Sequence, residues 1–328
     1  MKKREEWLDI LRGIAMIFVV IAHTGAPELY AKVYVPVFMS AFFFASGYTF
    51  SERDCFADFL KHKCKTILVP YFIFGTLNLI LAVVIQGDAI SDRLYGLLLS
   101  RSGLYDDLWF ITCLFSCELI FYWVVRFSKT TSGGNGKKYS AIIWGILIIY
   151  SLGHLYINFV GIPLPYQFEN ALVQMPYMAL GMFFRQTKVS IRRVKWKTIF
   201  ICALIYLLLV FLTPNGVNIH REQYGNACLY AIKSVLGTAI FAIAVYRLVG
   251  DNKRTALAPL AFVGRNTFVY YALQGKAIFV VNKVVGLVGL SDGNVYWLSP
   301  LKTLIIMFFV SDTSYYNQQM VPICFGKN

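Results

Sequence analysis

The first apolar run of the chain carries the sequence LDILRGIAMIFVVIAH, residues 8–23. A membrane-spanning helix needs about 20 mostly apolar residues, and the run around this sequence extends over residues 9–27. A basic start precedes it, as in a signal peptide. However, Arg12 and His23 interrupt the apolar residues and further spans follow directly, so we interpret it as a retained membrane helix.

Similar apolar runs recur along the whole chain. The ninth of them is long enough for one tilted helix plus a short preceding segment. The sequence therefore predicts an all-α, polytopic membrane helix bundle of about ten transmembrane helices, forming a single integral-membrane domain over residues 1–328 with no soluble domain. The expected spans are residues 9–27, 33–50, 66–86, 107–126, 139–158, 168–185, 197–213, 226–249, 262–290 and 295–311.

The composition supports a membrane protein and argues against nucleic-acid binding. Of 328 residues, 58% are hydrophobic and 15% are charged, whereas soluble proteins average about 45–50% apolar and about 25% charged residues. The net charge of +14 comes from basic residues between the apolar runs, not from one solvated face. This distribution is typical of the excess of basic residues in cytoplasmic loops.

The distribution of Lys and Arg also predicts the orientation. With the N-terminus in the cytoplasm, the expected cytoplasmic segments hold 21 basic residues and the expected outer loops hold four. Cytoplasmic loops carry the larger number of basic residues. We therefore expect a cytoplasmic N-terminus and a multi-pass protein of the cell (plasma or inner) membrane.

The seven cysteines imply neither a disulfide framework nor a metal site. Most fall in apolar runs or in loops expected to be cytoplasmic. Cys113 and Cys117 share a helix face, but no third or fourth ligand lies near them in the sequence. Packing is therefore the favoured interpretation, and no metal is expected.

Asp9, Arg12 and His23 are ionisable residues within or next to the first span, where such groups are costly and usually functional. Arg12 and His23 stand eleven positions apart, so they share one helix face about 16 Å apart along the axis, with Asp9 near the same face. Arg binds phosphate or carboxylate, and His can act as a general base. The structural alternative is that Arg12 anchors at lipid headgroups and His23 bonds a neighbouring carbonyl.

Glu118 lies about midway along the fourth span. A carboxylate at that depth needs a partner, such as Arg12 or a Lys from another helix. We keep both a catalytic role and a purely structural ion pair open for it.

Five segments of the chain resemble the acyltransferase 3 family of membrane O-acyltransferases, and its fucose 4-O-acetylase-like branch most closely. The first is the most specific, because Arg12 and His23 match an Arg and a His separated by ten residues. The others follow in family order: FFFASGY at 42–48, LVPYF at 68–72, LWF at 108–110, and FVGRNT at 262–267 followed by Tyr270 and Tyr271.

The resemblance implies a membrane O-acyltransferase, in the usual case an O-acetyltransferase, that moves an acyl group from cytoplasmic acetyl-CoA to a hydroxyl of a cell-surface or lipid-linked glycan. Arg12 and His23 are then the functional pair, and the matched motifs add substrate contacts at Trp109, Tyr71 and Gln274. Gln274 stands where relatives often carry His, a departure that leaves the Arg12 and His23 pair in place. Expected partners are the glycan, membrane lipid, and a second copy of the chain or polysaccharide-assembly proteins.

We expect His23 to serve as general base or transient acyl carrier, and Arg12 to meet the phosphates of the donor or orient its thioester. The basic residues Lys61, Lys63, Lys65 and Arg185 are candidates for attracting the phosphorylated nucleotide of CoA. The alternative for these four is the ordinary positive charge of cytoplasmic loops.

A transporter or flippase of a lipid-linked sugar or small anion is the second function class, because buried charges are equally frequent there. The sequence shows no internal repeat relating two halves, which such transporters often have. A membrane anchor or sensor is a third class. No output domain for it is expected.

Overall fold

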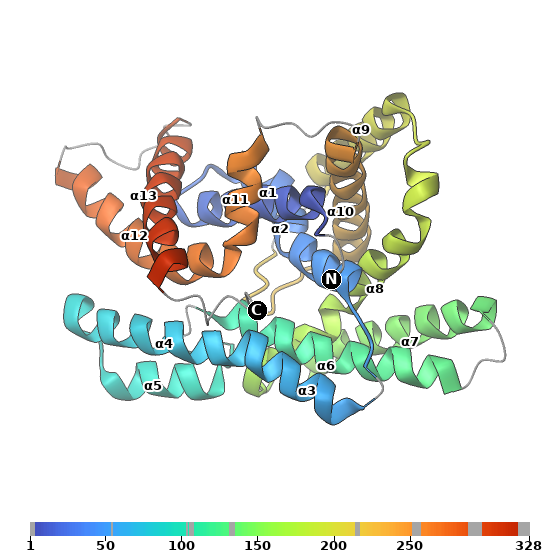
Figure 1. The fold of residues 1–328 in the computed structure, drawn as a ribbon, viewed down its shortest axis with the longest axis horizontal. Helices are drawn as coiled ribbons and strands as arrows, with labels where there is room; N and C mark the ends of the chain where they lie inside the picture. Colours follow the sequence, from blue (N-terminus) through green and yellow to red (C-terminus); the bar gives the residue numbers. More distant parts are fainter. Residues whose placement is uncertain are drawn as a thin grey trace. The chain divides into compact units, whose positions relative to one another are not determined.

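The computed structural model describes residues 4–53, 55–102, 104, 108–130, 135–213, 217–250, 257–287 and 297–320 (Figure 1). These residues form helices and loops, with one isolated bridge between Asn218 and Gln223 and no strand within the described ranges, which confirms the all-α prediction. The α-helices are α1 (Glu6–His23), α2 (Glu28–Thr49), α3 (Phe56–Lys63), α4 (Val69–Leu81), α5 (Ile90–Leu99), α6 (Trp109–Thr130), α7 (Asn135–Leu155), α8 (Phe168–Ile191), α9 (Trp196–Leu212), α10 (Ala227–Gly250), α11 (Ala258–Arg265), α12 (Thr267–Leu287) and α13 (Leu298–Met320).

Several helices are suited to a lipid environment. Among the described residues, five helical stretches are long and apolar enough to cross a membrane, namely Glu28–Thr49, Phe56–Ile85, Trp109–Thr130, Lys137–Val160 and Ala227–Val249. Large apolar side chains also lie on the outside, such as Phe159 at 83% exposed and Phe308 at 79%. Lipid rather than water solvates such surfaces. The count of ten spans and the cytoplasmic N-terminus stay predictions.

Two of the expected apolar runs can be compared with the observed helices in detail. The ninth run, residues 262–290, begins inside a short helix, α11, and continues in the longer α12, so a short segment does precede the main helix; the break lies at Asn266. The third run begins earlier than expected, because α3, the π-helical turn η1 (Cys64–Leu68) and α4 form one continuous helical stretch from Phe56. Lys61, Lys63 and Lys65 therefore lie on a helix and not in a loop.

The physical reason for this longer helix is the amphipathic sequence of α3. Phe59 is 1% exposed and packs against Tyr122, while Lys61 and Lys65 are exposed. The buried ring of Phe59 fixes this short polar helix, which the apolarity of its sequence does not reveal. Helix α5 lies outside the ten expected spans and buries Gly96 and Leu97.

The chain divides into two compact units, and the division falls inside α2, α8 and α10. Unit 1 comprises Met1–Phe42, Thr187–Asn215 and Ile232–Asn328, and unit 2 comprises Phe43–Gln186 and Gly216–Ala231. Each unit is described by itself below.

In unit 1, α1 and α11 approach each other at backbone distance (Figure 1). A Cβ on Gly13 would lie 2.1 Å from the carbonyl oxygen of Leu260, and one on Gly264 would lie 1.6 Å from that of Asp9. Only glycine allows this approach. The end of α1 is fixed to α13, because the Thr24 hydroxyl contacts the Ser299 hydroxyl at 2.7 Å and that of Thr303 at 3.3 Å.

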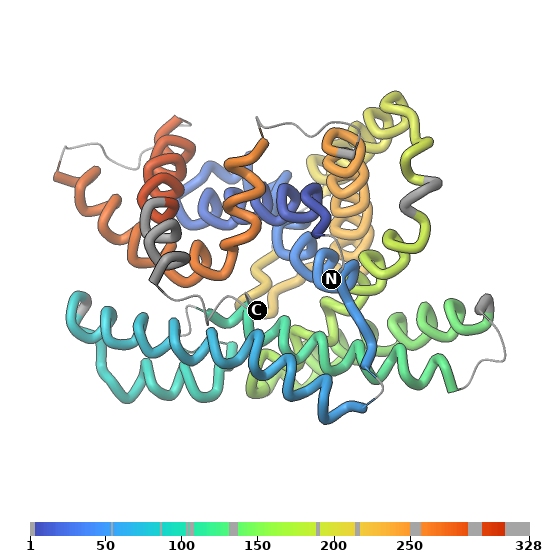
Figure 2. Tube along the Cα trace, viewed as in Figure 1, coloured from blue at the N-terminus to red at the C-terminus, as the bar shows by residue number. Residues whose placement is uncertain are grey.

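In unit 2, α3 runs beside α6 (Figure 2). The two helices pack through aromatic rings, with Tyr122 against Phe56 and Phe59. The second half of α2 approaches α8 as closely as α1 approaches α11. A Cβ on Gly47 would lie 1.9 Å from the Met178 carbonyl oxygen. This glycine belongs to the FFFASGY segment, so close helix packing accounts for its place there.

Candidate functional site

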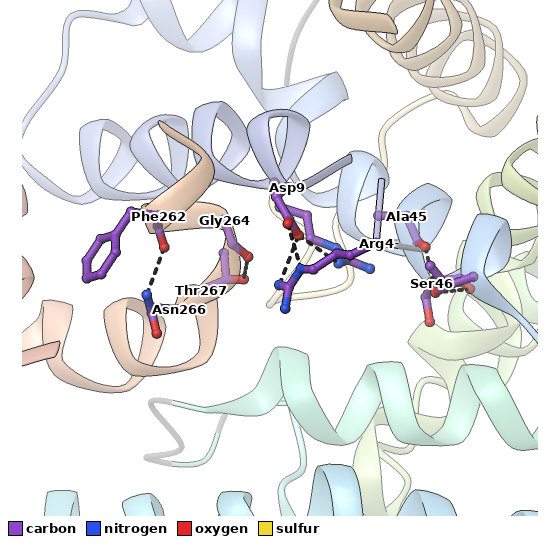
Figure 3. Close-up of polar contacts among 10 residues, drawn as sticks. Arg4, Asp9, Ala45, Ser46, Phe262, Gly264, Asn266 and Thr267 are labelled. Atoms are coloured by element: carbon purple, nitrogen blue, oxygen red, sulfur yellow. Dashed lines mark hydrogen bonds and ion pairs between the residues drawn. The ribbon is translucent and has the colours of Figure 1, made fainter. Parts of the chain in front are cut away.

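Asp9 is the centre of a small charged cluster at the start of α1 (Figure 3). Its carboxylate accepts hydrogen bonds from Arg4 Nε at 2.7 Å and Arg4 Nη2 at 3.1 Å. Arg12 Nη1 lies 3.8 Å from Oδ1 of this carboxylate, the oxygen to which Arg4 Nη2 also donates. Asp9 is 2% exposed, so two guanidinium groups compensate for its buried charge. The carboxylate thereby fixes the position of Arg12.

The FVGRNT segment, residues 262–267, packs against the helix turn that carries this cluster. Gly264 lies against the backbone of Asp9, and the Thr267 hydroxyl donates to the Gly264 carbonyl at 2.9 Å (Figure 3). Asn266 Nδ2 donates to the Phe262 carbonyl at 2.9 Å, which closes the end of α11. The first and last segments that the sequence analysis singled out are thus packed together.

His23 is the last residue of α1 and its side chain is exposed. Its Nδ1 lies 2.7 Å from the Val19 carbonyl oxygen, which requires Nδ1 to carry the hydrogen in the neutral ring. The Nε2 atom then holds the lone pair and can accept a proton. This contact agrees with the structural alternative for His23 and also selects the tautomer that a general base needs.

Arg12 and His23 lie on one uninterrupted helix, as predicted. Eleven residues at 1.5 Å each give about 16 Å between them along the axis, with nearly the same angular position. Arg12 is partly buried beside Asp9, whereas His23 is open. The helix therefore presents a held cation at one end and an accessible imidazole at the other.

Glu118, in unit 2, has the Lys partner that its position required. Lys63 Nζ lies 2.8 Å from Glu118 Oε1, and the Ser46 hydroxyl donates to the same oxygen. Glu118 is 2% exposed, and its second oxygen, Oε2, is buried without a hydrogen-bond partner. The ion pair predicted as one alternative is present, and one carboxylate oxygen stays available for a further donor.

The other basic candidates are placed differently from one another. Lys61 and Lys65 are exposed. Lys63 is committed to Glu118. Arg185 Nη1 donates to the Phe50 carbonyl at 2.8 Å, so it satisfies the end of α2 with at least part of its guanidinium. The four do not form one uniform cationic surface.

The three residues predicted to contact substrate also lie in different places in the structure. Tyr71 is 0% exposed and its hydroxyl donates to the Leu97 carbonyl at 2.8 Å, which places it in the packing of α4 on α5. Gln274 is buried in α12 of unit 1, and its Oε1 has no hydrogen-bond partner. Trp109 is half-buried at the start of α6, with its ring 5.1 Å from the His220 ring.

Sequence reasoning missed a polar network in unit 2, which we call the Tyr224 network. The Tyr224 hydroxyl donates to Asn170 Oδ1 and accepts from Gln174 Nε2 at 3.2 Å. Asn170 Nδ2 in turn donates to Gln167 Oε1 at 2.6 Å. Burial raises the pKa of Tyr224 well above its ordinary value, so its hydroxyl keeps its proton as the donor to Asn170.

Two carboxyl groups adjoin this network. The Glu169 carboxyl group lies close enough to that of Glu222 to interact with it, and Glu169 Oε2 accepts from the Leu164 backbone N–H at 3.1 Å. The available signal was the run of polar residues 167, 169, 170 and 174 at the start of an expected span. Amides carry no charge, so a search for ionisable residues passes over most of them.

Metal ligands do not gather in the described part of the chain. No three His, Cys, Asp or Glu side chains lie close enough there to hold an ion. Cys113 and Cys117 are free and fully buried in α6, and the Cys117 thiol contacts the Ala171 carbonyl at 3.6 Å. They pack α6 against α8.

Comparison with known proteins supplies the family. A family model described as an acyltransferase domain, acyltransferase 3, matches residues 5–315. Comparisons with curated proteins and with solved structures find no match. The matched range includes both the α1 cluster and the Tyr224 network. The chain therefore belongs to the acyltransferase 3 family and is a membrane acyltransferase.

Proposed function

We propose that the chain is an O-acetyltransferase that moves an acetyl group from cytoplasmic acetyl-CoA to a hydroxyl of a cell-surface or lipid-linked glycan. The observation that carries the proposal is the geometry of α1, where Asp9 holds Arg12 and the Val19 carbonyl sets the tautomer of His23. The family match supports acyl transfer in general. The resemblance to the fucose 4-O-acetylase-like branch supports the glycan.

His23 supplies the proton transfer in this proposal. Its Nε2 removes the proton of the acceptor hydroxyl while that oxygen attacks the thioester carbonyl. The tetrahedral oxyanion collapses, the carbon–sulfur bond breaks, and the imidazolium returns the proton to the leaving thiolate. In the alternative order, Nε2 itself attacks the thioester, which gives an acyl-imidazolium and the CoA thiolate. The acceptor hydroxyl then attacks the acyl group, its proton passes to the thiolate, and the neutral imidazole is restored.

Arg12 binds the donor. A guanidinium beside the cytoplasmic end of α1 pairs with phosphate oxygens through two parallel N–H groups. The axial separation of about 16 Å from His23 then requires an extended donor, whose thioester lies at the far end from its phosphates. The long arm of CoA has this form, which is the reason that we prefer CoA to a compact acyl donor.

The remaining candidates take supporting parts. Lys61 and Lys65, exposed on the expected cytoplasmic side, attract the phosphorylated nucleotide. Glu118 Oε2, which has no hydrogen-bond partner in the chain, accepts a hydrogen bond from the substrate in unit 2 and so orients it. The protein acts in the cell membrane, with membrane lipid around it. A second copy of the chain or polysaccharide-assembly proteins deliver or receive the glycan.

The test uses membranes that contain the full chain, labelled acetyl-CoA and the glycan fraction of the same cells. We expect His23→Ala to lower ester formation by about 10²- to 10⁴-fold, the usual contribution of a general base. His62→Ala is the matched control, because His62 is exposed on α3 and has no part in the proposal. Equal ester formation by wild type and His23→Ala contradicts the catalytic role of His23.

A deletion strain separates this function from the transporter alternative. The proposal expects surface polysaccharide that is exported normally but lacks acetyl esters. Loss of polymer export with full acetylation of the residual polymer is the result that favours a transporter.

A further inference from the structure

The Tyr224 network is a group of buried polar side chains that the proposed mechanism does not use. Gln167, Asn170 and Gln174 are each 0% exposed. They project from the start of α8 and from the residue before it, and Tyr224 connects them from the loop that precedes α10. In the predicted orientation, the loops that contain residues 159–167 and 217–225 face the outside of the cell.

Two side chains in the network leave hydrogen-bonding atoms unused. Gln167 accepts through Oε1 from Asn170, but its Nε2 has no partner. Gln174 donates through Nε2 to Tyr224, but its Oε1 has no partner. An unsatisfied buried polar atom costs about 1–3 kcal/mol, so one unpaired donor and one unpaired acceptor in the same network are evidence of an external partner.

The facing carboxyl groups add to this cost. Glu169 is 0% exposed, and its side chain meets that of Glu222. Two carboxylates in contact repel each other unless a proton or a hydrogen-bond donor lies between them. A bound hydroxyl group can supply that donor.

The border of the network is half-buried and backbone-strained. Trp109, Tyr166 and His220 are partly exposed, and Tyr166 is tied to α6 by the Ser116 hydroxyl at 2.9 Å from its carbonyl oxygen. Tyr166, Gln167 and Glu222 have φ angles of 57°, 53° and 58°. Non-glycine residues held there are strained, and such strain is concentrated at binding sites.

We propose that the Tyr224 network with Glu169 and Glu222 is the binding site for the sugar of the acceptor, which it holds through the sugar's hydroxyl groups. The inference rests on the proposed function for the identity of the acceptor. Gln167, Gln174, Glu169 and Glu222 make the contacts, Asn170 and Tyr224 position the two glutamines, and Trp109 offers an aromatic face at the border.

The hydrogen-bonding pattern selects a neutral polyol over an ion. Gln167 Nε2 donates, and Gln174 Oε1 and the two carboxyl groups accept. A sugar hydroxyl both donates and accepts, so it satisfies both kinds of atom. A cation is disfavoured by the donor of Gln167, and an anion by the two carboxyl groups. Aromatic side chains beside planar amides and carboxyl groups complete a site with both apolar and polar surfaces.

The test measures binding and transfer on the purified full-length chain. The probes are the methyl glycosides of glucose, galactose and fucose, and their fully O-methylated derivatives as ligands without hydroxyl groups. We expect at least one glycoside to raise the thermal midpoint of the wild type. Glu222→Gln and Gln174→Met should weaken glycoside binding and raise its KM by about tenfold each, with the KM for acetyl-CoA unchanged.

Glu28→Gln is the matched control, because Glu28 has a side chain that is 80% exposed and lies in unit 1. It should behave as the wild type. A second measurement needs no variant: carbodiimide amidation of Glu222 in the wild type, followed by mass spectrometry, should slow when the glycoside is bound. Three results overturn the site. The first is that the glycoside raises the thermal midpoint equally in all variants, and the second is that the O-methylated ligands or Ca²⁺ alone raise it as the glycoside does. The third is that the glycoside has no effect on the wild type.

The two proposals fail in different ways. If glycosides bind to the wild type and not to Glu222→Gln, but no protein forms acetyl esters, the site stands and the proposed function is wrong. If esters form and the glycoside KM is the same in all variants, the proposed function stands and the site is wrong.

Discussion

Asp9 in unit 1 and Glu169 in unit 2 are both buried carboxyl residues, with opposite surroundings. Asp9 accepts hydrogen bonds from Arg4 and has Arg12 within 3.8 Å. Glu169 accepts from backbone N–H groups, that of Leu164 among them, and faces the carboxyl group of Glu222. The first carboxylate is neutralised by the chain itself, whereas no Lys or Arg of the described residues is paired with the second.

This difference separates a carboxylate with a structural role, Asp9, from a carboxyl pair suited to bind a ligand, Glu169 and Glu222. A compensated carboxylate stabilises the fold and fixes Arg12 before any substrate arrives. An uncompensated pair lowers stability, and proteins retain such groups where a ligand completes them. Substitutions in the two regions should therefore change stability in opposite directions.

The largest effect is expected where α11 supports Asp9. Gly264→Val places side-chain atoms where even a Cβ would lie 1.6 Å from the Asp9 carbonyl oxygen, and backbone cannot move aside cheaply. We expect a loss of more than about 4 kcal/mol of stability, seen as failure to recover folded protein in detergent.

The matched control is Gly275→Ala in α12, where an added Cβ meets nothing within 4 Å. Removing a helical glycine there should raise stability by about 0.5–1 kcal/mol. If Gly264→Val melts at the wild-type temperature, α1 is not held by α11, and the interpretation of Asp9 as a fixed structural group loses its basis.

Lys63→Met extends the comparison to a second compensated carboxylate. It leaves Glu118, at 2% exposed, with the Ser46 hydroxyl alone. Removing one partner of a buried ion pair should cost about 3 kcal/mol, measured as a lower melting midpoint. Adding Glu118→Gln should recover part of this loss. If the double variant is no more stable than Lys63→Met alone, the pair is not coupled.

The sequence predicted the parts of the molecule that depend on strong, regular signals. Apolar runs gave the helices, and the spacing of Arg12 and His23 placed both on one continuous α1. The Lys partner of Glu118 was also anticipated, because a carboxylate at that depth needs a cation.

The rest depends on packing that a sequence does not express. The hydroxyl of Tyr71 is directed to Leu97 by the position of α5, a helix whose residues Gly96 and Leu97 are buried. The Tyr224 network joins residues about 50 positions apart through uncharged amides. Neither periodicity nor charge distinguishes such residues from ordinary polar ones before the fold is known.

Asp9→Asn is the direct test of the compensated carboxylate. The amide keeps the shape but removes the charge that Arg4 and Arg12 share, so we expect a loss of about 2 kcal/mol in stability and a raised KM for acetyl-CoA. Asp58→Asn, on an exposed position of α3, should change neither. A normal acetyl-CoA KM in Asp9→Asn shows that Arg12 does not need Asp9 to meet the donor.

Glu169→Gln is the corresponding neutral substitution in unit 2, with the smallest expected effect and the opposite sign. The amide can still accept from Leu164 and can donate to Glu222, so the repulsion between the carboxyl groups is removed. We expect a gain of about 1 kcal/mol in stability, measured as a higher melting midpoint, together with weaker glycoside binding.

The combination of the two readouts is what distinguishes the regions. A structural carboxylate loses stability on neutralisation, as expected for Asp9, whereas a ligand-binding one gains stability and loses affinity. If Glu169→Gln destabilises the protein as much as Asp9→Asn does, Glu169 is a structural group as well, and the Tyr224 network has to be interpreted as polar packing between α6, α8 and the loop before α10.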